Sequence, residues 1–208
     1  MRPTSSTDDR GQAHTVEAFI AALLLISGLL FAMQATAVTP LSASTSNQHI
    51  ENQQRALAGD LLSTADEDGT LKAAALYWNT SGGGFEETPD GETFYQNAGS
   101  QTAFLDSLQR TLSERRIAYN IVIRYHVYNE EVDQPEQERV TMVRMGQPSD
   151  NAVTASRTIT LSETDRLTGE DDCQLTDSDC AASFYAPNFD ADSQFYNRLE
   201  VRITTWRM

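Results

Sequence analysis

One stretch near the N-terminus constrains this chain more than any other feature. From Ala18 to Val38 there is no charged residue in 21 positions, and the part up to Met33 is interrupted only by Ser27 and Gly28. A helix of that length spans about 32 Å, against a hydrocarbon core of roughly 30 Å. Because the stretch has no polar stripe, it is unlike a helix buried in a soluble core. It therefore predicts a transmembrane helix.

The basic residues before this stretch predict its orientation. Arg2 and Arg10 precede it, with Asp8 and Asp9 beside them. The positive-inside rule counts Lys and Arg rather than net charge, so it favours a cytoplasmic N-terminus. We therefore expect a single-pass protein of the cell membrane with an extracellular C-terminal domain.

Three kinds of processing fit this N-terminus. The helix can stay as an uncleaved anchor, or it can be a secretory signal cut at the A-x-A site Ala35–Ala37. The apolar region is longer than that of an ordinary signal, and the segment before it contains acids, which disfavours the second fate. The third fate depends on the residues at the boundary itself.

These boundary residues are Arg10-Gly11-Gln12, then Thr15 and Glu17 at the start of the apolar helix. This arrangement resembles the class III leader of archaeal type IV pilins, and 35–44 is similar to haloarchaeal pilin-like proteins of unknown function. The resemblance implies that a prepilin peptidase cuts between Gly11 and Gln12 and leaves the helix attached. Glu17 is then the sixth mature residue, where pilins usually have the fifth; a cut after Gln12 would restore that count.

A carboxylate at the edge of an apolar helix is costly unless it is paired. The pilin resemblance implies an assembly role for Glu17, which would neutralise the free N-terminal amine of a neighbouring subunit. The alternative is an acid that the helix dipole favours in the first turn and that stays hydrated among lipid headgroups.

Charge is the strongest signal in the composition. Asp and Glu number 30 against 15 Lys and Arg, which gives a formal net charge of −15. Such a surface repels phosphate backbones and excludes nucleic acid as a partner. Lys72 is the single lysine, so the other basic residues are arginines. This composition resembles that of halophilic proteins, with chance composition as the alternative.

The predicted organisation has three parts: a cytoplasmic leader at 1–11, a transmembrane helix with its extracellular extension at 12–66, and an extracellular head at 67–208. Pro40 is expected to bend the helix or restart it. Apolar residues then recur at helical spacing and predict a helix that ends at Asp66–Gly69. They are Ile50, Leu57, Ala58, Leu61 and Ala65.

Two further helices are predicted in the head, at Leu71–Trp78 and Thr102–Arg116. A loop rich in Gly, Glu, Thr and Asp is expected between them, from Gly82 to Gly99. The second helix has an apolar face of Phe104, Leu105, Leu108 and Leu112.

The apolar period then changes to two, which is typical of strands. Strands are predicted at Tyr119–Val127, Val140–Met145, Val153–Leu161 and Leu199–Thr204, with a polar turn at Glu130–Glu138. We expect a three-stranded meander joined by the C-terminal strand, one face packed on helices. The predicted fold class is α+β: a long N-terminal transmembrane and amphipathic helix followed by a pilin-like head with an antiparallel sheet of about four strands.

No catalytic constellation is found in the sequence. His14, His49 and His126 form no metal-binding pair, and a G-x-S-x-G nucleophile motif is absent. His126 lies in a predicted strand and is interpreted as a structural residue. The sequence predicts no enzyme activity, no cofactor and no metal site.

Asn79-Thr80-Ser81 is an N-glycosylation acceptor triplet, expected on a surface loop. The triple glycine 82–84 lacks the Gly-Lys-Ser/Thr of a phosphate loop and is interpreted as a flexible turn.

Cys173 and Cys180 are the two cysteines, both in the predicted outer domain. In an extracellular domain they favour a local disulfide, with two free thiols as the alternative. Carboxylates at 170, 171, 172, 177 and 179 surround them. Calcium binding is one interpretation, but the EF-hand spacing is missing, so a solvated loop is favoured.

Five aromatic residues precede the last strand, and two interpretations of them stay open. They can pack the acidic loop onto the sheet, or they can form a contact between subunits. They are Phe184, Tyr185, Phe189, Phe195 and Tyr196.

Together these features predict a pilin-like or pseudopilin-like structural subunit of an archaeal cell-surface filament or complex. Its expected partners are membrane lipid, a prepilin peptidase and other pilin-like subunits. The alternative is a non-polymerising single-pass surface protein whose ectodomain binds a ligand or partner.

Overall fold

The structure is a computed structural model. It describes residues 8–89, 91–96, 99, 101–129, 134–169, 172–190 and 192–208, with side chains described in these ranges except at 8–13 and 34–47. The chain divides into two compact units, Met1–His49 and Ile50–Met208. Each unit is described below by itself.

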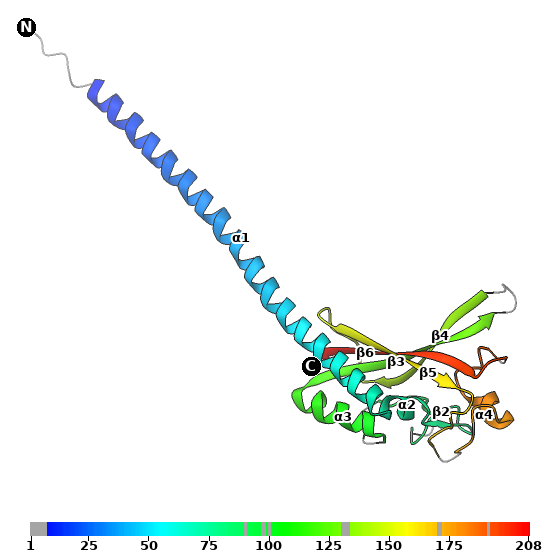
Figure 1. The fold of residues 1–208 in the computed structure, drawn as a ribbon. Helices are drawn as coiled ribbons and strands as arrows, with labels where there is room; N and C mark the ends of the chain where they lie inside the picture. Colours follow the sequence, from blue (N-terminus) through cyan, green and yellow to red (C-terminus); the bar gives the residue numbers. More distant parts are fainter. Residues whose placement is uncertain are drawn as a thin grey trace, which may run out of the picture. The chain divides into compact units, whose positions relative to one another are not determined.

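Helix α1 is assigned over Asp8–Glu67 (Figure 1). It contains Pro40, so the expected restart of the helix at this residue is wrong. Proline removes one hydrogen bond and strains a helix, but it need not end it where both flanks are helical. The side chain of Pro40 lies outside the described residues, and a bend there stays a prediction. The predicted end is confirmed: Gly69 adopts a left-handed φ of 74° just after the last turn.

The second unit begins with the last turns of α1, whose apolar stripe is confirmed from Leu57 to Ala65, while Ile50, also predicted in it, is partly exposed. Ala58, Leu62 and Ala65 are buried in the core, while Leu57 and Leu61 pack against it from the sides. Burying this stripe fastens the end of α1 to the head and leaves its polar side in solvent.

The short helix α2, Thr70–Ala75, ends earlier than predicted. Trp78 is not helical; it lies in strand β1, Trp78–Asn79, which pairs with β2, Gly84–Phe85. Its ring is buried against Phe85, with 5.2 Å between the ring centroids, because the aromatic core outweighs the local helical pattern.

Helix α3, Ala103–Thr111, confirms the second predicted helix of the head with a shorter C-terminal end. The Thr102 side chain caps it by accepting a hydrogen bond from the Leu105 amide at 3.3 Å. A 3₁₀ turn, η1, Ser113–Arg115, follows, and Arg116 with a φ of 59° turns the chain into the sheet. The predicted apolar face, Phe104, Leu105, Leu108 and Leu112, is fully buried.

Four antiparallel strands form the main sheet, as predicted. They are β3 (Ile117–Asn129), β4 (Gln134–Arg144), β5 (Val153–Ser162) and β6 (Phe195–Arg207). Their order is β4-β3-β6-β5, so the expected three-stranded meander is wrong: β5 pairs with β6 and not with β4. The C-terminal strand takes a central place, where its apolar residues Leu199, Val201 and Ile203 are fully buried.

The predicted polar turn between the first two strands is also shorter than expected. Residues 134–138 belong to β4 and pair with the end of β3, from Asn129↔Gln134 to Tyr125↔Glu138. Their polar side chains are exposed, which is tolerated because an antiparallel hairpin needs no apolar face beyond the core.

The sheet has one packed face and one open face. Alternate β3 residues, among them Tyr119, Ile121 and Ile123, are buried in a core shared with α1, α2 and α3. Figure 1 shows α2, α3 and the short helix α4 (Ser178–Ser183) on the same side of the sheet. The intervening residues, such as Asn120, Val122 and Arg124, point to the open face and are partly exposed.

Candidate functional site

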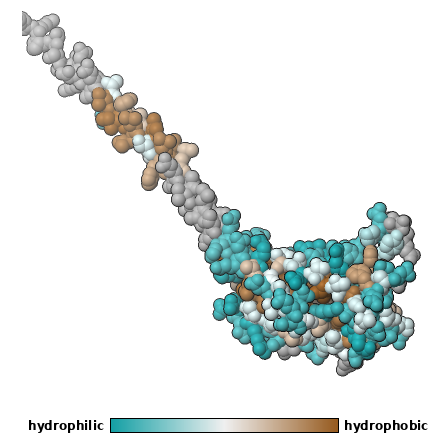
Figure 2. Space-filling view, in the orientation of Figure 1, coloured by the Kyte–Doolittle hydropathy of each residue, from teal (hydrophilic) through white to brown (hydrophobic). Residues whose placement is uncertain are grey.

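The apolar segment of the first unit is the most distinctive surface of the chain. Of the described helices, one is long and apolar enough to cross a membrane: His14–Met33, with a mean hydropathy of 2.3. Figure 2 shows the apolar side chains of this segment on its surface. None of its residues is buried, and Leu25 and Phe31 are each 75% exposed. Water solvates such a surface poorly, so the segment is compatible with a single membrane span.

This segment starts four residues before the predicted span and so includes His14 and Glu17. The side chains of 34–38, the weaker end of the prediction, lie outside the described residues. Glu17 Oε2 is 3.7 Å from His14 Nδ1, one helical turn away, and the two side chains are 80% and 82% exposed. Glu17 therefore has a neighbouring imidazole that can balance the carboxylate charge when the imidazole is protonated.

The leader residues Gly11 and Gln12 fall in the helical backbone of α1, but the side chain of Gln12 lies outside the described residues. The expected cleavage between them stays a prediction, and so does the assembly role of Glu17.

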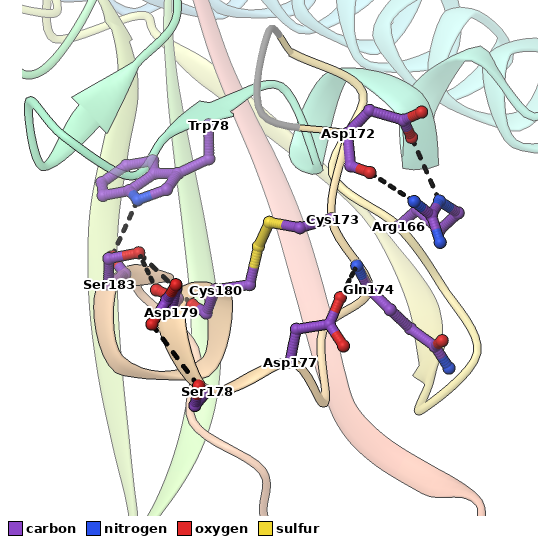
Figure 3. Close-up of a disulfide and its surroundings, with 10 residues drawn as sticks. All are labelled: Trp78, Arg166, Asp172, Cys173, Gln174, Asp177, Ser178, Asp179, Cys180 and Ser183. Atoms are coloured by element: carbon purple, nitrogen blue, oxygen red, sulfur yellow. Dashed lines mark hydrogen bonds and ion pairs between the residues drawn. A yellow bond between two sulfur atoms is a disulfide. The ribbon is translucent and has the colours of Figure 1, made fainter.

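The disulfide between Cys173 and Cys180 is confirmed (Figure 3). The two Cα atoms are 6.3 Å apart, and Cys180 is buried at the start of α4. Backbone hydrogen bonds fasten the same loop to the chain before it: Leu167 N donates to Cys173 O at 2.9 Å, and Leu175 N to Asp165 O at 3.0 Å. The loop is thus held at both ends and along its length.

The carboxylates of this loop do not converge. Asp172 accepts a hydrogen bond from Arg166 Nε at 3.1 Å, and the Asp177 side chain accepts one from the backbone N–H of Gln174 at 2.9 Å. Asp179 is exposed and lies near Ser178 (Figure 3). No group of three His, Cys, Asp or Glu residues suited to a metal ion is found in the described part of the chain. Positions 170 and 171 lie outside it.

The aromatic residues near α4 pack the loop onto the rest of the head, which confirms one of the two interpretations for three of them. Phe184 and Tyr185 surround Trp78, with ring centroids 6.4 Å and 5.1 Å from it, and Trp78 Nε1 donates to Ser183 O at 2.8 Å. Tyr196 is fully buried beneath the loop, 6.4 Å from Phe184, and desolvation raises its pKa to about 12.

Asn79 lies at the end of strand β1 rather than in a loop, and the rest of its triplet begins the following turn. Its amide nitrogen donates to Glu86 Oε2 at 3.1 Å, and its amide oxygen accepts from the Gly82 amide at 2.5 Å. A glycan would be attached to the nitrogen that contacts Glu86. Use of the triplet stays a prediction. Gly82 and Gly83 lie in the tight turn between β1 and β2, with a φ of 67° at Gly83, and Gly84 begins β2.

The structural interpretation of His126 agrees with its contacts. Its backbone is hydrogen-bonded to the buried side chain of Asn197, its ring packs edge-on against Phe189, and Nε2 is 3.2 Å from Arg198 Nη2. Sequence reasoning overlooked Asn197, and it also overlooked the arginines on the open face of the sheet. The signal for the latter was present: Arg198 and Arg202 lie at positions of the strand that alternate with its apolar residues, with Glu200 between them.

Comparison with known proteins places the chain in a family without assigning it an activity. No curated protein matches the chain, and no solved structure does. A family described as "Family of unknown function (DUF7288)" matches residues 10–205, which include the apolar helix and all but the last three residues of the head. The chain therefore belongs to this family of unknown function, DUF7288.

Proposed function

We propose that this protein is a pilin-like structural subunit, anchored in the membrane of an archaeal cell by its N-terminal helix and able to assemble with neighbouring copies. The observation that supports this most is the difference between the two parts of α1, one apolar and exposed, the other buried on one side. Residues 14–33 present apolar side chains on all sides, while Ala58, Leu62 and Ala65 are buried in an α+β head. A helix that is apolar in one half and packed on a head in the other half is the pattern implied by the pilin resemblance.

The apolar half can pack against other helices as well as against lipid. Ala21, Ala22 and Gly28 are small residues that allow helix backbones to approach closely within a bilayer. An added Cβ at Gly28 would meet no atom within 4 Å, so the chain's own packing does not require this glycine. Helix–helix packing in a filament core is a role that would require it.

The head is proposed to lie outside the cell. The disulfide fits an oxidising compartment, and the acidic surface fits a protein exposed to high salt. In this function the head acts by contact rather than by catalysis. Membrane lipid, a prepilin peptidase and other pilin-like subunits are its partners, and nucleic acid is not.

Intact-mass analysis of the protein purified from native membranes tests the proposal. A mature N-terminus at Gln12 or Ala13 supports pilin-type processing, and a Gly11→Val variant should then retain residues 1–11. A start at Met1 would contradict pilin-type processing, and a start at Val38 would identify a secreted protein.

A second candidate is a non-polymerising surface protein with a partner-binding ectodomain, and the position of His14 favours it. A histidine one turn before Glu17 can balance the carboxylate within one chain, so that no neighbouring amine is needed. Glu17→Ala, with Glu51→Ala as a control on the same helix, separates the two. The pilin-like role predicts that only Glu17→Ala reduces the amount of assembled subunit, whereas the second candidate predicts no change from either variant.

A further inference from the structure

The open face of the sheet carries an unusual concentration of arginine. We call the arginine face the five arginines whose register positions lie there: Arg124, Arg139, Arg144, Arg198 and Arg202. The strand register pairs each of these five positions with another position on the open face. All five side chains are partly or fully exposed. Five of the chain's 15 basic residues therefore share one side of one sheet.

This face has the opposite charge to the rest of the chain. On the described residues of the four strands, Glu200 is the one carboxylate at an open-face position, and its Oε2 is 3.9 Å from Arg124 Nη1. The chain as a whole has a net charge of −15. Arg124 and Arg139 are also directly opposite each other on neighbouring strands, where two like charges destabilise the pair. A bound anionic group would remove that repulsion.

Hydroxyl groups complete the surface. Thr154, Ser156, Thr158 and Thr160 of β5 alternate with its core-facing residues and lie on the same face, and Thr154 Oγ1 is 3.0 Å from Thr204 Oγ1. Arginine and hydroxyl side chains together are good donors to carboxylates, arginine in a bidentate manner. The face is therefore chemically suited to a surface of aspartate and glutamate side chains.

The chain itself offers such a surface in the disulfide loop, which we define as residues 172–180. Asp172, Asp177 and Asp179 are exposed there. The disulfide and the backbone hydrogen bonds to 165 and 167 hold the loop in shape, so little conformational entropy is lost when it binds.

The loop cannot reach the arginine face of its own copy. Its neighbours are on the helix side of the sheet: Thr168 N donates to Leu76 O at 3.0 Å, and Tyr185 Oη to Ala75 O at 3.0 Å. Figure 1 shows α4, which contains the end of the loop, on that same side. A contact between loop and face must therefore join two molecules.

We propose that the arginine face of one copy binds the disulfide loop of a second copy. The two surfaces differ, so the contact is heterologous and leaves a free face and a free loop at the ends, which permits open assembly. It deepens the proposed function, on which it rests for the presence of neighbouring copies. Two chains of charge −15 repel overall, so local charge complementarity selects this orientation over others.

Charge reversal on each surface tests the contact in the full chain in detergent micelles. The face variant is Arg139→Glu/Arg144→Glu, at two exposed positions. The loop variant is Thr176→Arg/Asp179→Arg, which leaves the Asp177 hydrogen bond intact. The matched control is Arg55→Glu/Arg115→Glu, with the same change of charge at exposed positions off the face.

Sedimentation measures the dissociation constant for self-association at low ionic strength. Each test variant alone is expected to weaken association by about tenfold or more, while an equimolar mixture of the two restores pairing, because the unchanged face of the loop variant then meets the unchanged loop of the face variant. The control should differ from the native chain by less than about threefold. Equal association of all variants, or no recovery in the mixture, would overturn the proposal.

Two results separate this inference from the proposed function. If the mature chain begins at Met1 and the mixture still recovers, pilin-type processing fails while the contact stands. If filaments form and the face variant assembles like the native chain, the contact fails while the proposed function stands. Binding of vesicles that contain anionic phosphatidylglycerol, lost in the face variant without any self-association of the native chain, would identify lipid as the occupant and overturn the proposal.

Discussion

The side chain of Asn197 in β6 forms hydrogen bonds with both backbone groups of His126 in β3, as a paired strand residue would. Its Oδ1 accepts a hydrogen bond from His126 N at 3.1 Å, and its Nδ2 donates to His126 O at 2.8 Å. The backbone register between β3 and β6 ends at Arg124↔Glu200, so Asn197 extends the pairing beyond it. The same amide also contacts Pro187 O and Arg198 N, and the residue is fully buried.

Replacement of this residue should destabilise the head. Asn197→Ala removes a fully buried side chain and takes this partner from partly buried backbone groups of His126 and Pro187. We expect a loss of about 1–3 kcal/mol in the free energy of unfolding. Denaturant unfolding of the full chain in mild detergent, followed by tryptophan fluorescence, measures it. Asn129→Ala is the control, because its hydrogen bond to Glu136 is exposed, and it should cost less than about 0.5 kcal/mol. Equal effects of both variants would contradict this role.

The elements of this fold were largely predictable from residue pattern. The apolar segment, the stripe from Leu57 to Ala65, the face of α3 and all four strands follow from periods of 3.6 and two, which each element shows within its own sequence. The disulfide was predictable because the chain has two cysteines, which lie close together in the sequence and allow one pairing.

What pattern could not supply was the order of the strands and the convergence of distant residues. The position of β6 between β3 and β5 depends on which strand has the most apolar surface to bury, a comparison across the whole domain. Trp78 was predicted as helical because its local context is helical, yet its partners Phe85 and Tyr185 lie in two other segments. Likewise, the arginine face joins residues from three strands, so no single stretch of sequence displays it.

The disulfide should contribute measurably to the stability of the head. Closing a loop with a sequence separation of 7 restricts the unfolded chain by about 2–2.5 kcal/mol in the chain-entropy description. Cys173→Ala/Cys180→Ala is therefore expected to lower the unfolding midpoint, and reductant should shift the native chain by a similar amount. The double variant itself should not respond to reductant. A native midpoint that is the same with and without reductant would contradict a stabilising role.

Buried tyrosines predict a loss of stability at high pH. Desolvation raises the pKa of Tyr196 and of Tyr125 from 10.0 to about 12, and a hydrogen bond to Glu138 adds to the shift at Tyr125. The folded chain therefore keeps these phenols protonated after the unfolded chain has begun to lose their protons. The stabilisation is complete below pH 10 and is lost as the pH rises through 12.

Tyr196→Phe isolates one such group. The Tyr196 hydroxyl is buried and has no hydrogen-bond partner among the described residues, so its removal should be neutral or slightly stabilising at pH 8. At pH 11 the variant should be more stable than the native chain, because Phe cannot ionise on unfolding. Denaturant unfolding at the two pH values, with tyrosinate absorbance as the titration readout, measures both. If the variant and the native chain differed by the same free energy of unfolding at both pH values, the raised pKa of Tyr196 in the folded chain would be contradicted.

Two glycines of the head should respond in opposite ways to the same substitution. A Cβ at Gly84 would lie 2.8 Å from the Thr93 Cα, a backbone atom that cannot yield without moving the segment beside β2. Gly84→Ala should therefore cost about 1–3 kcal/mol. Gly59 lies within α1, where an added Cβ meets no atom within 4 Å. Gly59→Ala should stabilise the helix by up to about 1 kcal/mol, because alanine loses less backbone entropy in a helix. Unfolding midpoints of the two variants, compared with the native chain, test both signs at once. A stabilising Gly84→Ala would contradict the close contact between β2 and the segment at Thr93. It would also mean that the β1–β2 hairpin is not held rigidly beside the aromatic residues around Trp78.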